Sequence, residues 1–308
     1  MRMRNVCVAP DASDSNGNLM SKLNKVPASA GAEWLLGGFA LLRKAPLALG
    51  LLGMLWGMLS LLVVQVMALD PTVGLLLQLG LSVMGPLLFA GLLWAVHEVD
   101  HDRPAVPGHL LHALRSDKVS SLLATLLPQV IAALVLGALL LVLIGPDQLE
   151  QLAGVIEELQ RSAQAGAPPD PELVRNLPVG RLFLWVLLML GAAAASGLFV
   201  FVAVPQIMFG GRGGMAAMGD SFRACLRNLP AVLLFLALLA IALFGIGVLV
   251  QLLAVVVQLV AGATAAIWVS NLLLMAVLMP LMAGAVYHAW RQLLGTPEAA
   301  QPLGRFEA

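Results

Sequence analysis

Charged residues are scarce in this chain of 308 residues. Asp, Glu, Lys and Arg make up 11% of it and hydrophobic residues 60%, whereas an average soluble domain has about 25% charged residues. So few charges cannot give a soluble core of this size a polar surface, and the excess apolar surface must face lipid. The formal net charge is zero, without a long basic block that would attract a polyanion. We therefore expect the lipid bilayer as a partner and no nucleic-acid ligand.

Cysteine is also rare, with only Cys7 and Cys225, which is not the pattern of a disulfide framework. We expect Cys225 to be a small buried apolar residue. Residues 1–19 are polar and lack the apolar region of a secretory signal. Met20 is a candidate alternative start, so residues 1–19 are an extension or part of a disordered tail. Disordered tails are predicted at 1–25 and 295–308, on either side of a membrane domain at 26–294.

Long stretches without any charged residue predict the membrane spans. The longest lies between Arg227 and Arg291, and a helix rising ~1.5 Å per residue through a hydrocarbon core ~30 Å thick needs about 20 residues. This stretch therefore holds two spans joined as a hairpin. With four shorter stretches, the sequence predicts an all-α, polytopic membrane helical bundle with six transmembrane helices and short interfacial helices. The predicted spans are about 46–67, 74–97, 119–144, 182–209, 230–254 and 265–288.

Basic residues predict the orientation of these spans, because Lys and Arg near span ends stay in the cytoplasm. Fourteen Lys and Arg residues fall on the side of the two termini and three on the other. We expect a multi-pass protein of the bacterial cytoplasmic (inner) membrane with both termini in the cytoplasm. Trp34, Trp94 and Trp290 fall near the predicted cytoplasmic interface, where an indole keeps its N–H in contact with water.

Two segments resemble interfacial helices that lead into a span. Residues 33–46 and 220–230 each mix apolar and basic residues, and each has an arginine (Arg43, Arg227) three residues before a proline. Such a segment can lie in the membrane plane, and proline suits the first turn of the helix that follows.

One sizeable loop, 145–180, is predicted on the outer side. Its leucine and isoleucine residues recur at helical spacing opposite glutamates, which predicts a short amphipathic helix. This helix is expected to cover its own bundle as a lid, to lie on the outer leaflet, or to bind a periplasmic or membrane protein partner. Gly53 and Gly57, and the run of small residues at 191–197, predict close packing of helices within the bundle.

The residues His97, Glu98 and His101 match the zinc-protease pattern H-E-x-x-H. Two histidines one helical turn apart can hold Zn²⁺ while the glutamate activates a water molecule. Against this hypothesis, Asp100 places a charge inside the motif, Pro104 soon ends the helix, and no third ligand is evident. We otherwise expect a polar membrane border, and the metalloprotease is kept as the alternative function.

Transport is a further hypothesis. The predicted spans contain no Asp or Glu, and ion-coupled carriers commonly need intramembrane charges. Polar amides do lie in or near the bilayer, so a neutral or lipid-like solute fits better than an ion. The amides are Gln65, Gln78, Gln129, Gln206, Gln251 and Gln258, and prolines that can break helices are Pro86, Pro128, Pro205 and Pro280.

The segment 26–46, with Val26, Trp34 and the basic-x-x-proline border at Arg43 to Pro46, and the acidic, proline-containing loop 98–107 resemble a family of uncharacterised bacterial six-span inner-membrane proteins. The resemblance covers residues 20–294. It implies no assigned reaction or cofactor, and no catalytic, cofactor-binding or metal-binding residue. We expect a non-enzymatic role in membrane organisation or assembly, or in the passage of a neutral or lipid-like solute.

Overall fold

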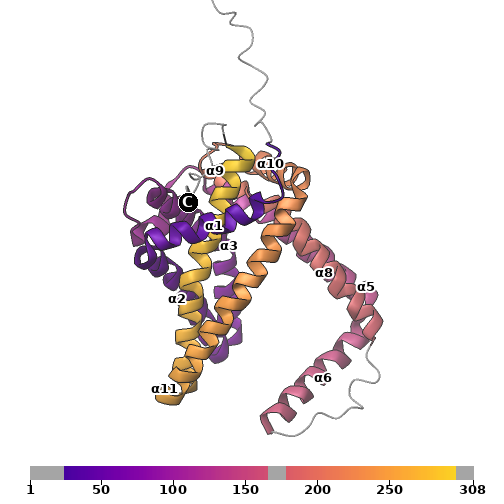
Figure 1. Ribbon diagram of the computed structural model, residues 1–308. Coiled ribbons are helices and arrows are strands. Elements are labelled where there is room, and N and C mark those ends of the chain that lie inside the picture. Colours follow the sequence, from indigo (N-terminus) through magenta and orange to yellow (C-terminus); the bar gives the residue numbers. More distant parts are fainter. Residues whose placement is uncertain (1–23, 166–177, 296–308) are drawn as a thin grey trace, which may run out of the picture.

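The computed structural model describes residues 24–165 and 178–295 (Figure 1). Every regular element in these ranges is a helix, which confirms the predicted all-helical class. Cys7, the candidate start Met20 and nearly all of both predicted tails lie outside the described residues. The elements are α1 (Ala30–Lys44), α2 (Pro46–Leu69), α3 (Pro71–Asp100), η1 (Pro107–Leu111), η2 (Ala113–Arg115), α4 (Val119–Ala124), α5 (Leu127–Leu143), α6 (Pro146–Ala165), α8 (Val179–Val200), α9 (Ala203–Met208), α10 (Gly214–Arg227) and α11 (Leu229–Leu294).

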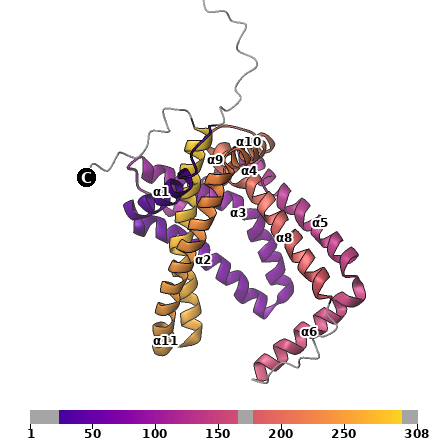
Figure 2. The same cartoon turned by 45° about the vertical axis from the view of Figure 1, so that its right-hand side comes forward.

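Five helical stretches of the described chain are long and apolar enough to cross a membrane: Pro46–Leu69, Pro71–Asp100, Val119–Leu143, Val179–Met208 and Leu229–Leu294. The last of these, α11, has 66 residues, about 100 Å at ~1.5 Å per residue. It is not straight, because Gly262 has φ 86° and ψ 171°, a conformation that glycine adopts most readily. In Figures 1 and 2, α11 folds back at its lower end into two arms that lie side by side.

Proline interrupts two of the predicted spans and leaves two others continuous. Pro128 and Pro205 follow the α4–α5 and α8–α9 breaks, because a proline ring collides with the carbonyl four residues earlier. At the second break, the Ser221 hydroxyl of α10 donates to Leu198 O at 2.8 Å and accepts from Val202 N at 3.1 Å. Pro86 and Pro280, by contrast, lie inside α3 and inside the second arm of α11, and neither interrupts its helix.

Helix α1 crosses both arms of α11 at very close range. A Cβ on Gly31 would collide with the backbone at Ala231, and one on Gly38 would lie 2.6 Å from Leu281 O. Trp34 is fully buried, and its Nε1 donates to Gln292 Oε1 at 2.8 Å. The expectation that this indole keeps its N–H in contact with water is therefore wrong, since Gln292 replaces the water.

The predicted packing role of the GxxxG pair in α2 is confirmed. A Cβ on Gly53 would collide with Met275 O, and one on Gly57 would lie 2.9 Å from Met275 Cβ, on the second arm of α11. The run of small residues at 191–197 of α8 packs only in part: Ser196 is buried and donates to Pro128 O at 3.4 Å, whereas a Cβ on Gly191 or Gly197 would meet no atom within 4 Å. These two glycines face open space because α8 has no neighbouring helix on that side.

The boundary predicted for the N-terminal tail, residue 25, lies too far along the chain, because hydrogen bonds already hold Asn24 to the folded part. Asn24 N donates to Leu293 O at 3.1 Å, and its side-chain amide donates to Gln292 O at 3.0 Å. Asn228, only 2% exposed, accepts from Val26 N at 2.8 Å and donates to Asn24 O at 2.9 Å. Residues 24–26 are thus ordered by hydrogen bonds to the ends of α10 and α11.

Helices α5 and α8 form a pair that diverges from the other long helices (Figure 2). Trp185 Nε1 donates to Leu136 O at 3.0 Å, which ties the two helices together. Helix α6 continues from α5 after Gly145, whose φ is 84°, and confirms the predicted helix in the outer loop. Neither Figure 1 nor Figure 2 shows α6 packed against α2, α3 or α11, so the lid expected over the bundle is not seen.

Helix α10 places the thiol of Cys225 in the protein interior, as predicted. This side chain is 0% exposed and forms no disulfide. Burial raises the pKa of the Cys225 thiol to about 12, so the thiol stays protonated and unreactive at neutral pH.

Candidate functional site

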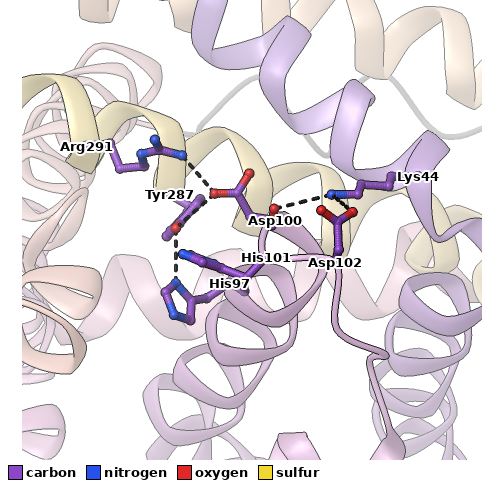
Figure 3. A network of polar contacts seen from close by, with 7 residues as sticks. All are labelled: Lys44, His97, Asp100, His101, Asp102, Tyr287 and Arg291. Carbon is purple, nitrogen blue, oxygen red and sulfur yellow. Dashed lines mark hydrogen bonds and ion pairs between the residues drawn. The ribbon is translucent and has the colours of Figure 1, made fainter. Parts of the chain in front are cut away.

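The two histidines of the H-E-x-x-H pattern, His97 and His101, lie at the end of α3, beside the last turns of α11 (Figure 3). Asp100 Oδ2 accepts from Arg291 Nη1 at 2.8 Å and from the Tyr287 hydroxyl at 3.2 Å. The Tyr287 oxygen is also 3.1 Å from His97 Nδ1. Because the single hydroxyl proton of Tyr287 goes to Asp100, His97 Nδ1 carries the proton of the second bond. A continuous polar chain, Arg291–Asp100–Tyr287–His97, therefore joins α3 to α11.

Lys44, at the end of α1, holds the loop that follows α3. Its Nζ is 2.7 Å from Asp102 Oδ1 and donates to Asp100 O at 3.3 Å. The hydrogen bond and positive charge of Lys44 lower the pKa of Asp102 below its ordinary value of 3.8. Three helices, α1, α3 and α11, thus meet at one polar junction.

Aromatic rings enclose the other side of this junction. The ring of Trp94 stacks on His112 with centroids 4.1 Å apart and planes at 11°. Phe209 lies 4.9 Å from the His97 ring and 5.8 Å from the Tyr287 ring. Burial lowers the pKa of His112 below its ordinary value of 6.5, so the neutral imidazole is favoured against Trp94.

The geometry does not fit the zinc-protease hypothesis. Glu98, which would have to activate water, is bound by Arg103 through two contacts of 2.6 and 2.9 Å. His97 is engaged by Tyr287, and the Nδ1–H of His101 donates to His97 O at 2.8 Å. No group of three or more His, Cys, Asp and Glu in the described parts of the chain could hold a metal ion. These residues form a structural junction instead.

A second feature is a cavity of about 910 Å³ between the diverging α5–α8 pair and the helices α2, α3 and α11. It is open at the side and its lining carries no charged residue. Three polar side chains reach it. Ser82 and Thr125 donate their hydroxyl protons to carbonyls of their own helices, Gln78 O at 2.8 Å and Leu122 O at 2.6 Å. The apolar lining includes Trp56, Leu79, Val83, Pro86, Phe89, Leu126, Val130, Ala133, Val200, Val204, Leu239, Leu243, Leu278, Met279 and Met282.

Gln129 is the third polar side chain of this cavity. Its amide has no hydrogen-bond partner among the residues that the structure places. Another of the predicted amides, Gln206, is only 4% exposed and accepts from Trp290 Nε1 at 2.7 Å. Of these two amides, Gln129 is the one whose donor and acceptor groups are available to a ligand.

The sequence hypotheses included His97 and His101 as zinc ligands and Gln129 as one of six amides, but missed Tyr287 and Arg291. Two signals were present: Tyr287 is the only tyrosine of the chain, and Arg291 is the first charged residue after the longest charge-free stretch. Their spacing of four residues puts both side chains on one face of a helix. Together they indicate a polar contact at the membrane border.

Comparison of the chain with protein-family models, with curated proteins and with solved structures gave no match.

Proposed function

We propose that this protein is a multi-pass protein of the bacterial inner membrane that binds a neutral, lipid-like solute in its lateral cavity. The observation that carries the proposal is the apolar cavity of about 910 Å³ between candidate spans. Its volume lies within the range of about 300–1,000 Å³ that is typical of ligand sites, and such sites combine apolar walls with a few polar groups.

The chemistry of the lining selects the ligand. An ionic solute has no counter-charge in the cavity, and leaving a charge unpaired in the membrane is costly. The Gln129 amide offers one donor group and one acceptor to a ligand. The ligand we propose therefore has hydrocarbon chains and one neutral hydrogen-bonding group, such as an ester, amide or hydroxyl.

The membrane topology that goes with this function has six spans and cytoplasmic termini. Each arm of α11, on either side of Gly262, has roughly 32 residues and is about 48 Å long, which is enough to cross a core of ~30 Å. The excess of basic residues on the side of the termini supports the orientation. The resemblance to bacterial six-span inner-membrane proteins over residues 20–294 supports the compartment.

A docking role in membrane organisation is the second candidate, and it rests on α6. This helix does not pack on the long helices in Figures 1 and 2, and Ile156 is 48% exposed. A periplasmic or membrane protein partner would bind this face of the 145–180 loop. Crosslinking from Ile156 to a second protein in intact membranes would support docking over carriage.

Bound lipid in the purified protein tests the carrier proposal. Native mass spectrometry should detect a neutral ligand on the wild type, and Ala133→Trp should remove it by filling the cavity. Ala138→Trp is the matched control, because Ala138 is exposed on the same helix and does not line the cavity. Gln129→Leu should weaken binding of a ligand with a hydrogen-bonding group about fivefold, the worth of one hydrogen bond of ~1 kcal/mol.

Equal ligand occupancy in Ala133→Trp and Ala138→Trp would refute the cavity as the binding site. A wild type that never carries a neutral ligand, even after incubation with total membrane lipid, would refute the proposed function.

A further inference from the structure

Helix α10 has one face in the protein and one face that the protein leaves uncovered. Its inward face contains the buried residues Gly214, Ala217, Met218, Asp220, Ser221, Ala224 and Cys225. On the other face, Met215 is 67% exposed and Leu226 is 48% exposed, and Arg223 and Arg227 are exposed as well.

The exposed face is itself divided into an apolar and a basic stripe. At ~100° per residue, Met215 and Leu226 fall within about 20° of one another, and Arg223 and Arg227 follow within the next ~100°. Phe222 borders this stripe on the protein side, where it is half-buried and its ring stacks on Phe199 with centroids 4.4 Å apart. Around the helix, the apolar stripe therefore lies between the protein-facing side and the two arginines. This is the arrangement of a helix that lies in a membrane surface, with apolar residues among acyl chains and cations among headgroups.

Neither arginine of this face is paired within the described protein. Among the described residues, Arg223 and Arg227 have no hydrogen-bond or ion-pair partner. Arg212, just before the same helix, differs because its Nε is 3.1 Å from Asp220 Oδ2. The spacing of four residues places Arg223 and Arg227 on the same side of the helix, with Cβ atoms about 5–6 Å apart, so one phosphate can contact both guanidinium groups.

The apolar stripe continues into the surface of the spanning helix. Past the break at Asn228, Leu229, Leu233 and Leu236 recur at helical spacing along α11 and are 38%, 55% and 49% exposed. In a membrane-spanning helix this exposed apolar surface of α11 faces lipid. The apolar stripe of α10 lies next to the end of that lipid-facing surface. Figures 1 and 2 place α10 at that end of the long helices, lying across them.

We infer that α10 is a binding site for anionic phospholipid, with a headgroup phosphate held by Arg223 and Arg227 and its acyl chain beside Met215 and Leu226. Guanidinium groups bind phosphate through charge-assisted hydrogen bonds. The same two charges draw α10 toward the negatively charged cytoplasmic leaflet. The site is separate from the lateral cavity, whose ligand is neutral, so each proposal can fail without the other.

Native mass spectrometry of the full chain in detergent, with added phosphatidylglycerol or phosphatidylcholine, tests this site. A basic residue near an anionic surface is worth ~1 kcal/mol, so each arginine contributes about fivefold to the preference for phosphatidylglycerol. The double variant R223Q/R227Q should lose roughly thirtyfold of that preference. R223K/R227K should keep most of it, because the charge remains.

The matched control is Arg161→Gln. Arg161 is exposed on α6 and is paired with Glu157 at 2.8 Å and Glu158 at 2.6 Å, so its loss should leave the lipid preference unchanged. Full labelling protection of Cys225 in each variant shows that α10 is still folded. A wild type without preference for phosphatidylglycerol would overturn the proposal and favour a soluble acidic partner. Retained preference in R223Q/R227Q, or equal loss in Arg161→Gln, would overturn it as well.

Discussion

Gly53→Ala tests whether α2 and α11 cross as closely as the structure shows. The added Cβ would lie 2.9 Å from Ala276 Cα and would collide with Met275 O, whereas ordinary contacts are about 3.5–4.0 Å. Both atoms belong to the backbone, so no side-chain rotation relieves the overlap. Overpacking costs about 1–3 kcal/mol, and the higher helix propensity of alanine offsets up to ~1 kcal/mol. Because the clashing atoms are backbone, we take the upper part of that cost, about 2–3 kcal/mol, and expect a net loss of about 1–2 kcal/mol in the free energy of unfolding.

The assay is thermal exposure of the buried Cys225 thiol to a maleimide dye, in a Cys7→Ser background that leaves one reactive group. A loss of 1 kcal/mol should lower the midpoint by about 2–4 °C. Gly80→Ala is the control, because a Cβ on Gly80 of α3 would meet no atom within 4 Å. That variant should be unchanged or slightly stabilised. Equal midpoints for Gly53→Ala and Gly80→Ala would refute the close crossing.

Three further predictions use the same assay. Tyr287→Phe removes both hydrogen bonds that the hydroxyl makes with α3, and should cost about 1–2 kcal/mol; an unchanged midpoint would mean that the polar chain does not hold α3 to α11. Asn228→Ala removes three side-chain hydrogen bonds and should lower the free energy of unfolding by about 2–3 kcal/mol. Asn271→Ala should leave it unchanged or raise it by about 1 kcal/mol, because the buried side-chain oxygen of Asn271 has no partner among the described residues. Burial lowers the pKa of His112 below 6.5, so the stability that the neutral imidazole contributes is complete above pH 6.5 and is lost as the pH falls through the lowered pKa. His112→Phe keeps a ring on Trp94 and should flatten this part of the profile of midpoint against pH. An identical profile in wild type and variant would refute the assignment.

Hydropathy predicted what depends on apolarity alone. The charge-free stretches match the long helices, and the burial of Cys225 follows from its type. Hydropathy does not separate lipid-facing from protein-facing residues, which is why the burial of Trp34 was missed. Pro128 and Pro86 both have mainly apolar neighbours in the sequence, yet only Pro128 follows a helix break. That difference depends on neighbouring helices.

The candidate sites show the same division. The sequence offered Gln129 only as one of six amides in or near apolar stretches, and the cavity around it forms only where the α5–α8 pair diverges from the other helices. Asp100 and Arg291 are 191 residues apart, and nothing in either local sequence indicates the other. Contacts between distant segments therefore account for most of what was not predicted.

The crossing of α1 over α11 constrains the order in which the protein can mature. Ribosomes make α1 first, but the surface on which α1 packs belongs to the end of the chain. It includes Ala231 and Phe235 on one arm of α11 and Leu281 and Ala285 on the other. Docking must therefore wait until translation has delivered the final hairpin to the bilayer. A nascent chain that stops at Gly262 has only half of that surface: Trp34 could already meet Phe201 and Phe235, but the hydrogen bond from its indole to Gln292 must wait for the second arm.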